Sequence, residues 1–292
     1  AIHAVGTSED SPSEAFPYTR GKDVSMQKAE SSYSSWDANL PTVADFRWPN
    51  GVRAAASLSF DDGRRSQIER GIPLLNQYGV KATFYVVPRA VEIHTDQWIS
   101  AVAAGHEIGN HTLTHPCSGN FSFARNNPLE QYTLDRMAGE LDEASSALVR
   151  LLGASPETFA YPCGQQFVGR GSNVQSYVPL VARRFSAGRG WRDERHNPPG
   201  FCDLARLYAV AVDCLTFDEL RYYLDAALEE GGWLVLAGHD VGAEPTTRQV
   251  VLESTLAELC RFATQSRNGL WLDTVAAVAR YVRSVRSNPT PP

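Results

Sequence analysis

The sequence predicts an α/β fold built on a parallel sheet, because short apolar runs alternate with segments of helical periodicity along most of the chain. Seven or eight such units indicate a closed or nearly closed barrel, with a doubly wound open sheet as the alternative. With 292 residues, of which 43% are hydrophobic, the chain can bury a large core without structural metals or disulfides.

The predicted strands are apolar runs that stop at turn residues: 54–60, 82–87, 107–109, 158–161, 184–187, 207–212, 233–237 and a short one near Leu270. The predicted helices are 68–79, 98–104, 128–152, 218–230 and 251–264. The helix 128–152 has the clearest pattern, because its apolar residues fall three or four apart and Gly153 suits a C-cap.

Composition sets the limits of the domain and excludes some functions. Residues 1–48 are rich in Ser, Glu, Asp and Pro, and we expect an extension that is loose or drapes over a domain at 49–287, followed by a frayed tail at 288–292. The net charge of -6 argues against nucleic-acid binding, and no apolar run approaches the ~20 residues of a membrane span. The sequence starts at Ala1 without Met, which is expected either of a chain that has lost a leader or of an artificial start. If Ala1 is a processed start, a secreted or periplasmic location is favoured.

The five cysteines show no CxxC spacing, so the sequence supports neither a disulfide framework nor a thiolate zinc site. At least one of them must remain unpaired within the chain.

Titratable residues follow several predicted strands. Asp61 and Asp62 come after the first strand, His111 and His115 after the third, and His239 after the strand 233–237. Active sites of parallel α/β folds lie beyond the carboxyl ends of the strands, so we expect these side chains to converge on one rim.

The spacing of His111 and His115 suits metal binding. Two imidazoles four residues apart on a helical turn share one face and can bind the same ion, although the pattern alone is weak. Pro116 directly afterwards indicates a loop at the end of a strand, where sites are common. Of the adjacent carboxylates Asp61 and Asp62, one can bind the ion while the other serves as general base. A histidine beside them, His239, suits a general acid.

Four ordered motifs resemble those of the polysaccharide deacetylase family, also called the NodB-homology or carbohydrate esterase 4 family. They are Phe60–Gly63, Gly105–Pro116, Tyr161–Gly164 and Leu236–Asp240. The resemblance implies a distorted (β/α) barrel of about seven strands. It implies that Asp61 is the catalytic base, that Asp62, His111 and His115 hold one divalent ion, often zinc, and that His239 is the catalytic acid.

The sequence departs from this family in two places. An Arg that contacts the base in many members would fall at Ala160, and an Asp-Trp pair near the catalytic His would fall at Thr216-Phe217. Asp213 and Asp240 are candidates to tune Asp61 and His239 instead.

Other site residues follow from the expected chemistry of acetyl hydrolysis. The backbone N–H of Tyr161 or Cys163 could stabilise an oxyanion. Rim aromatics could stack on a sugar, although each is more often core: Phe167, Trp191 and Phe217.

The sequence thus favours a deacetylase of an acetylated carbohydrate that depends on one divalent metal ion, with Zn²⁺ expected ahead of other divalent ions. N-acetyl groups are preferred because an amine leaving group needs the acid most, and O-acetyl groups are the alternative. One alternative is an amide or imide hydrolase for a small anionic molecule, bound by Arg64, Arg65, Arg170 or Arg189. The other is an inactive carbohydrate-binding module.

Overall fold

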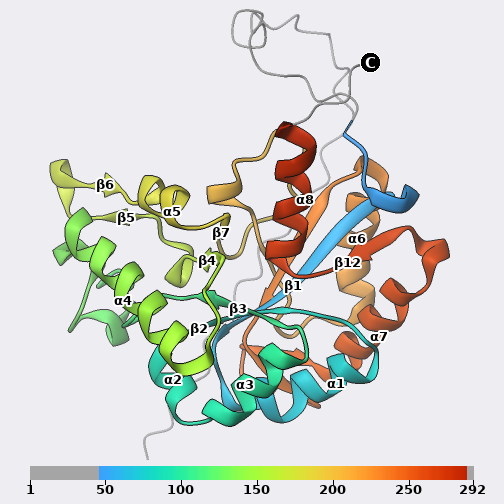
Figure 1. Cartoon of the computed structure of the whole chain (residues 1–292), viewed down its shortest axis with the longest axis horizontal. Coiled ribbons are helices and arrows are strands. Elements are labelled where there is room, and N and C mark those ends of the chain that lie inside the picture. The colour runs from blue at the N-terminus through green and yellow to red at the C-terminus, as the bar shows by residue number, and fades with distance from the viewer. Residues whose placement is uncertain (1–45, 288–292) are drawn as a thin grey trace, which may run out of the picture. The chain divides into compact units, whose positions relative to one another are not determined.

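A parallel sheet forms the centre of the domain. The computed structural model describes residues 46–287, which belong to one compact unit (Figure 1). The strand order is β7-β4-β3-β2-β1-β9-β8, with β12 beside the start of β1. These strands are β1 (Ala54–Asp62), β2 (Thr83–Val86), β3 (Glu107–Asn110), β4 (Thr158–Ala160), β7 (Ala187–Arg189), β8 (Val210–Ala211), β9 (Trp233–Gly238) and β12 (Leu270–Leu272).

The two ends of this strand order meet. A parallel bridge pairs Arg189, at the end of β7, with Leu207, just before β8. Leu207 N–H donates to the Gly188 carbonyl at 2.8 Å, and Gly190 N–H donates to the Leu207 carbonyl at 2.8 Å. The predicted distorted (β/α) barrel is therefore confirmed. The alternative of an open doubly wound sheet is excluded, because such a sheet would leave its two edge strands apart.

Helices connect the strands and pack outside the sheet (Figure 1). They are α1 (Ile72–Gln77), α2 (Pro88–Glu92), α3 (Thr95–Ala103), α4 (Leu134–Leu152), α5 (Val178–Arg184), α6 (Phe217–Glu230), α7 (Glu253–Thr264) and α8 (Val275–Ser287). Short strand pairs lie apart from the main sheet: β5 (Phe167–Val168) with β6 (Gln175–Ser176), and β10 (Asp240–Gly242) with β11 (Val250–Leu252). No helix in residues 46–287 is long and apolar enough to cross a membrane.

The side-chain alternation of β1 places its carboxylate inside the barrel. Leu58 and Phe60 face the main core, where Phe60 stacks on Phe84 with ring centroids 5.2 Å apart. Successive side chains of a strand point to opposite faces, so Ser59 and Asp61 point to the barrel interior. All residues of β1 up to Asp61 are buried.

Several predicted boundaries were wrong. The helix predicted from Pro128 begins at Leu134, where the Thr133 side chain caps it. The strand predicted at 184–187 lies at 187–189, so Arg189 ends a strand, while Arg184 ends helix α5. The helix predicted over 68–79 begins as a π-helical segment, Gln67–Gly71, before α1.

The start of the described chain packs on the domain. Trp48 is 6% exposed, and its indole N–H donates to the Gly231 carbonyl at 2.9 Å. Phe46 packs beside it and beside Tyr281 of α8. The expected extension otherwise falls on residues 1–45, outside the described residues, as does the expected tail.

Candidate active site

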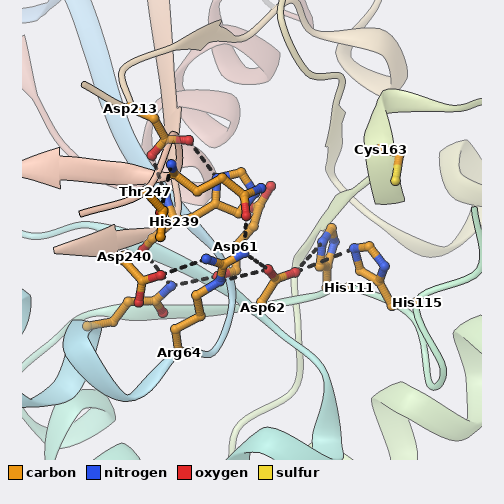
Figure 2. A network of polar contacts seen from close by, with 12 residues as sticks. Asp61, Asp62, Arg64, His111, His115, Cys163, Asp213, His239, Asp240 and Thr247 are labelled. Carbon is orange, nitrogen blue, oxygen red and sulfur yellow. Dashed lines mark hydrogen bonds and ion pairs between the residues drawn. The ribbon is translucent and has the colours of Figure 1, made fainter. Parts of the chain in front are cut away.

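One pocket collects the titratable residues at the carboxyl ends of the strands. Its volume is about 650 Å³, and Asp61, Asp62, His111, His115 and His239 all line it. Figure 2 shows Asp61 and Asp62 between His239 on one side and the two other histidines on the opposite side. The convergence predicted from the strand ends is thus present in the structure.

Three side chains form a cluster that could hold a metal ion. Asp62 Oδ1 lies 3.6 Å from His111 Nε2 and 3.4 Å from His115 Nε2. Their potential ligand atoms all lie within 4.8 Å of one another. One carboxylate and two imidazoles are a donor set that suits Zn²⁺ and neighbouring transition metals, and three protein ligands leave positions open for water and substrate. The residues therefore fit the implied ion.

The two histidines are brought together by a loop and not by a helical turn, so the predicted geometry was wrong. Thr112 and His115 adopt left-handed backbone conformations, with φ of 65° and 55°. Asn110 Oδ1 accepts from Thr112 N–H at 2.7 Å, and Thr112 Oγ1 accepts from His115 N–H at 2.9 Å. His111 Nδ1 lies 2.9 Å from the Ala160 carbonyl oxygen. Donation of Nδ1–H to this oxygen leaves Nε2 free for the ion.

A buried carboxylate on α4 holds this loop. Glu140 is 8% exposed and accepts the backbone N–H of Leu113 at 3.0 Å and of Thr114 at 2.9 Å. The hydroxyls of Thr114 and Tyr132 donate to its other oxygen at 2.7 and 2.8 Å. Glu140 therefore fixes the residues between the two histidines. This role was not predicted because Glu140 has the pattern of an ordinary polar position on a helix.

Burial and neighbouring charges set the protonation states of Asp62, His111 and His115. Burial would raise the pKa of Asp62, but its hydrogen bond to His111 and the charges of His111, His115 and Arg64 lower it, so the carboxylate is ionised. Burial and the nearby His111 lower the pKa of His115 to about 4. Burial opposes charge on His111 too, yet Asp61 and Asp62 raise its pKa above the usual value. At neutral pH His115 is therefore a neutral imidazole, which is the form of histidine that can bind a metal ion.

The other carboxylate has a buried cationic partner. Asp61 is 4% exposed and Arg189 is 0% exposed, and Arg189 Nη2 donates to Asp61 Oδ1. Arg189 also donates to Ser59 Oγ at 3.2 Å and to the Gly190 carbonyl at 2.9 Å, and its guanidinium lies over the Tyr85 ring. Arg189 thus supplies, from β7, the cation that the family pattern would place at Ala160. Because Arg189 is fully buried and paired with Asp61, it does not suit the anion-binding role that the small-molecule alternative offered it.

Arg64 is also held by carboxylates. Its guanidinium donates to Asp62 Oδ2 at 2.8 Å, to Asp240 Oδ2 at 2.6 Å and to Gln249 Oε1 at 2.9 Å (Figure 2). Asp240 accepts a further hydrogen bond from Ser66 Oγ at 2.6 Å. The Asp240 side chain therefore makes no hydrogen bond to Asp61 or His239. Arg64 holds Oδ2 of Asp62, while Oδ1 faces the two histidines.

His239 forms a dyad with Asp213. His239 Nδ1 lies 2.7 Å from Asp213 Oδ2, and His239 N–H donates to Asp213 Oδ1 at 3.0 Å. This pairing turns Nε2 toward the pocket, where Gln249 Nε2 lies 3.4 Å away. Trp191 contacts the imidazole edge to face, with ring centroids 4.7 Å apart. Asp213 and Trp191 therefore both contact the His239 side chain.

Thr216 and Phe217 lie outside this dyad. Thr216 caps α6 through a reciprocal bond with Glu219, and Phe217 packs against Phe262. Gln67 links the two halves of the site instead. It is fully buried, and its Nε2 donates to the Asp61 carbonyl at 2.6 Å and to the His239 carbonyl at 2.9 Å.

Of the two residues predicted to stabilise an oxyanion, only Cys163 lines the pocket. Tyr161 N–H donates to the Arg189 carbonyl at 3.0 Å, and the Tyr161 hydroxyl donates to the Ala205 carbonyl at 2.7 Å in the core, so neither faces the pocket. Cys163 lines the pocket, and its N–H makes no backbone bond among the described residues. Gly164 allows this turn, with φ of 69° and a hypothetical Cβ only 3.0 Å from Trp191 Cβ.

A disulfide connects two of the site loops. Cys117 and Cys163 are joined, while Cys202, Cys214 and Cys260 are free. The lack of CxxC spacing had given no support for a disulfide framework. The two partners are 46 residues apart, and no sequence pattern marks a pair at that separation.

Two aromatic residues at the pocket were not predicted. Phe121 and Phe123 are 43% and 66% exposed, stack with ring centroids 5.4 Å apart and line the pocket. Of the predicted aromatics, only Trp191 lines it, since Phe167 lies at another hollow. The sequence did offer one indication of this pair. Two Phe residues lie two positions apart in a segment without apolar periodicity, which suggests exposed and not buried aromatic side chains.

Comparison with known proteins agrees with these features. A family model described as polysaccharide deacetylase matches residues 41–176. A gellan lyase from a Bacillus species is 27% identical over 158 residues, which are 53% of this chain and 6% of that protein. A peptidoglycan-N-acetylglucosamine deacetylase from Bacillus cereus is 28% identical over 122 residues, which are 42% of this chain and 41% of that protein. The chain thus spans less than half the length of these curated relatives.

A solved structure from Mycobacterium smegmatis, assigned to the polysaccharide deacetylases, has a TM-score of 0.59 at 18% identity and covers 82% of this chain and 93% of that one. At this identity the likeness concerns the fold alone. Together, the matched family model and the shared fold confirm that this chain resembles the polysaccharide deacetylase family.

Proposed function

We propose that the chain is a metal-dependent deacetylase that removes acetyl groups from a carbohydrate, with N-acetyl groups preferred. The observation that carries this proposal is the arrangement of one pocket, in which Asp61 and the His239–Asp213 dyad flank the Asp62–His111–His115 cluster. The peptidoglycan-N-acetylglucosamine deacetylase among the relatives supports the substrate class.

The residues divide the work of acetyl hydrolysis. When bound at the cluster, a divalent ion would polarise the acetyl carbonyl and acidify water. Asp61, held by Arg189, accepts the proton of the attacking water. Cys163 lines the pocket, and we assign its N–H as the donor to the developing oxyanion. His239 gives its Nε2 proton to the leaving amine and becomes neutral. Asp213 accepts from Nδ1–H, which stabilises the protonated ring before this transfer and fixes its orientation.

Phe121 and Phe123 extend the pocket with an exposed apolar face. Such faces suit the C–H side of a pyranose ring, because aromatic side chains combine a large apolar surface with fixed geometry. We propose that a sugar next to the acetylated residue stacks there.

Acetate release tests this function. The full chain, loaded with Zn²⁺, is incubated with chitin oligomers, peptidoglycan and acetylated xylan, with a chelator-treated sample as control. We expect metal-dependent acetate release, largest from an N-acetylated substrate. Metal-dependent hydrolysis of a small cyclic imide without acetate release would favour the small-molecule alternative, although three of the cations proposed for it are already paired: Arg64, Arg65 and Arg189. Carbohydrate binding without any hydrolysis would favour the inactive module.

A further inference from the structure

The Cys117–Cys163 disulfide forms part of the wall of the active-site pocket. It joins the loop after β3, which carries His115, to the loop after β4. Cys117 is fully buried, whereas Cys163 is partly exposed and lines the pocket. Figure 2 shows Cys163 on the same side of the site as His111 and His115. The disulfide is therefore reachable from the pocket at one of its two sulfur atoms.

The two ring nitrogens of His115 lie near two different potential metal ligands. Its Nε2 lies 3.4 Å from Asp62 Oδ1, and its Nδ1 lies 3.8 Å from Cys117 Sγ. A metal-binding histidine usually donates its second N–H to a carbonyl or carboxylate, as His111 does with Ala160. The only side-chain partner of His115 Nδ1 in the described part of the chain is the sulfur of Cys117.

The donor atoms of His115, Cys117 and Cys163 lie within 4.8 Å of one another. We propose that reduction of the disulfide creates a second metal site from His115 Nδ1 and the two thiolates, for a thiophilic divalent ion such as Zn²⁺, Co²⁺ or Cd²⁺. An imidazole with two thiolates is a donor set that such ions accept, with a fourth position left for water. The proposal rests on this geometry and does not require that the chain hydrolyses acetyl groups.

The reduction balances with a dithiol as reductant. A thiolate of the dithiol enters the pocket and attacks Cys163 Sγ, the S–S bond breaks, and Cys117 leaves as a thiolate. The second thiol then attacks the mixed disulfide, which releases Cys163 as a thiolate and the reagent as a cyclic disulfide. Two electrons pass from the dithiol to the protein. His115 is then shared by two donor sets, so the thiol redox state would change how the pocket holds metal.

Cobalt binding tests the second site. Denatured, unreduced protein should titrate three thiols, and protein reduced with dithiothreitol should titrate five, the three free cysteines plus the two released. After anaerobic removal of the reagent, native protein is titrated with Co²⁺. We expect a near-ultraviolet thiolate-to-cobalt charge-transfer band that saturates at one equivalent in the reduced chain and is missing from the oxidised chain.

Two variants separate this site from other thiols. The reduced double variant Cys117→Ser/Cys163→Ser should lose the band. The reduced control variant Cys202→Ser should keep it, because the Cys202 thiol is away from this site and accepts a hydrogen bond from Arg286. Circular dichroism checks that each protein is folded. A folded, reduced chain with five titrated thiols and no band would overturn the proposal, as would a band that survives in the double variant.

Discussion

Arg189 and Asp61 form a buried ion pair across the barrel interior, although β7 and β1 are separated by three strands in the sheet. Both side chains are nearly or wholly inaccessible to water. A buried charge is tolerated only with a partner, so each residue fixes the other. This pair fixes the proposed base in the pocket lining, together with the Asp62–His111–His115 cluster.

Removing one member of this pair should cost stability. In Arg189→Met the Asp61 carboxylate loses its partner, and we expect the free energy of unfolding to fall by about 3–5 kcal/mol. The double variant Arg189→Met/Asp61→Asn buries no charge and should regain part of this loss. Urea unfolding of wild type, both single variants and the double variant measures the coupling. Additive effects of the two substitutions would contradict the pairing.

The His239–Asp213 dyad should matter for turnover and not for metal binding. We expect His239→Ala to lower kcat by roughly 10²–10⁴-fold, the usual range for a general acid or base. Asp213→Asn keeps the size of the side chain but accepts less strongly from His239 Nδ1, so a smaller loss is expected. Elemental analysis should find the same metal content as in wild type. Near wild-type turnover of an amide substrate by His239→Ala would remove this residue from the mechanism.

The aromatic pair should affect sugar binding alone. Phe121→Ala/Phe123→Ala removes the exposed platform, and losing about 1 kcal/mol of contact raises KM for an acetylated oligosaccharide roughly five-fold. The KM for a small acetyl ester, which does not reach the platform, should not change. Tyr222→Ala is the matched control, because Tyr222 is 74% exposed on α6 and does not line the pocket. Equal changes with both substrates would argue against a sugar platform.

A buried histidine outside the site should make stability depend on pH. Burial and the charge of Lys81 lower the pKa of His106 to about 4. His106 Nδ1 accepts from Ala82 N–H at 3.2 Å, and protonation would abolish this bond. Because the unfolded histidine has a pKa near 6.5, the unfolded chain binds more protons between about pH 6.5 and 4, and stability falls as the pH is lowered through this range.

The expected loss from this group is on the order of 2–3 kcal/mol. His106→Asn keeps an acceptor for Ala82 but cannot titrate, so its unfolding free energy should change less between pH 7 and pH 4. Urea unfolding at both pH values compares the two proteins. An equal pH dependence in wild type and variant would exclude His106 as the cause.

Local patterns predicted most of the scaffold. Buried apolar runs located β1, β2, β3 and β9, and the residues at their ends converge because parallel strands share one carboxyl edge. Long-range partners could not be predicted in this way. The pairing of Arg189 with Asp61 was not predicted, because the strand expected at 184–187 lies at 187–189 and arginine is rarely buried.

The loop of His111 and His115 was taken for a helical turn because left-handed conformations at Thr112 and His115 have no residue signature such as glycine. The Cys117–Cys163 pair joins loops that only the folded barrel brings together.

The central claim is that one ion at Asp62, His111 and His115 serves a reaction in which Asp61 is the base. The most direct measurement is acetate release from an N-acetylated oligosaccharide while metal is titrated into metal-free protein. We predict that wild-type turnover saturates at one ion per chain, and that Asp62→Asn requires far more metal. Asp61→Asn should bind one ion and release acetate at least 10²-fold more slowly. Wild-type acetate release that does not change when the ion is removed, or Asp61→Asn turnover equal to wild type, would contradict the account.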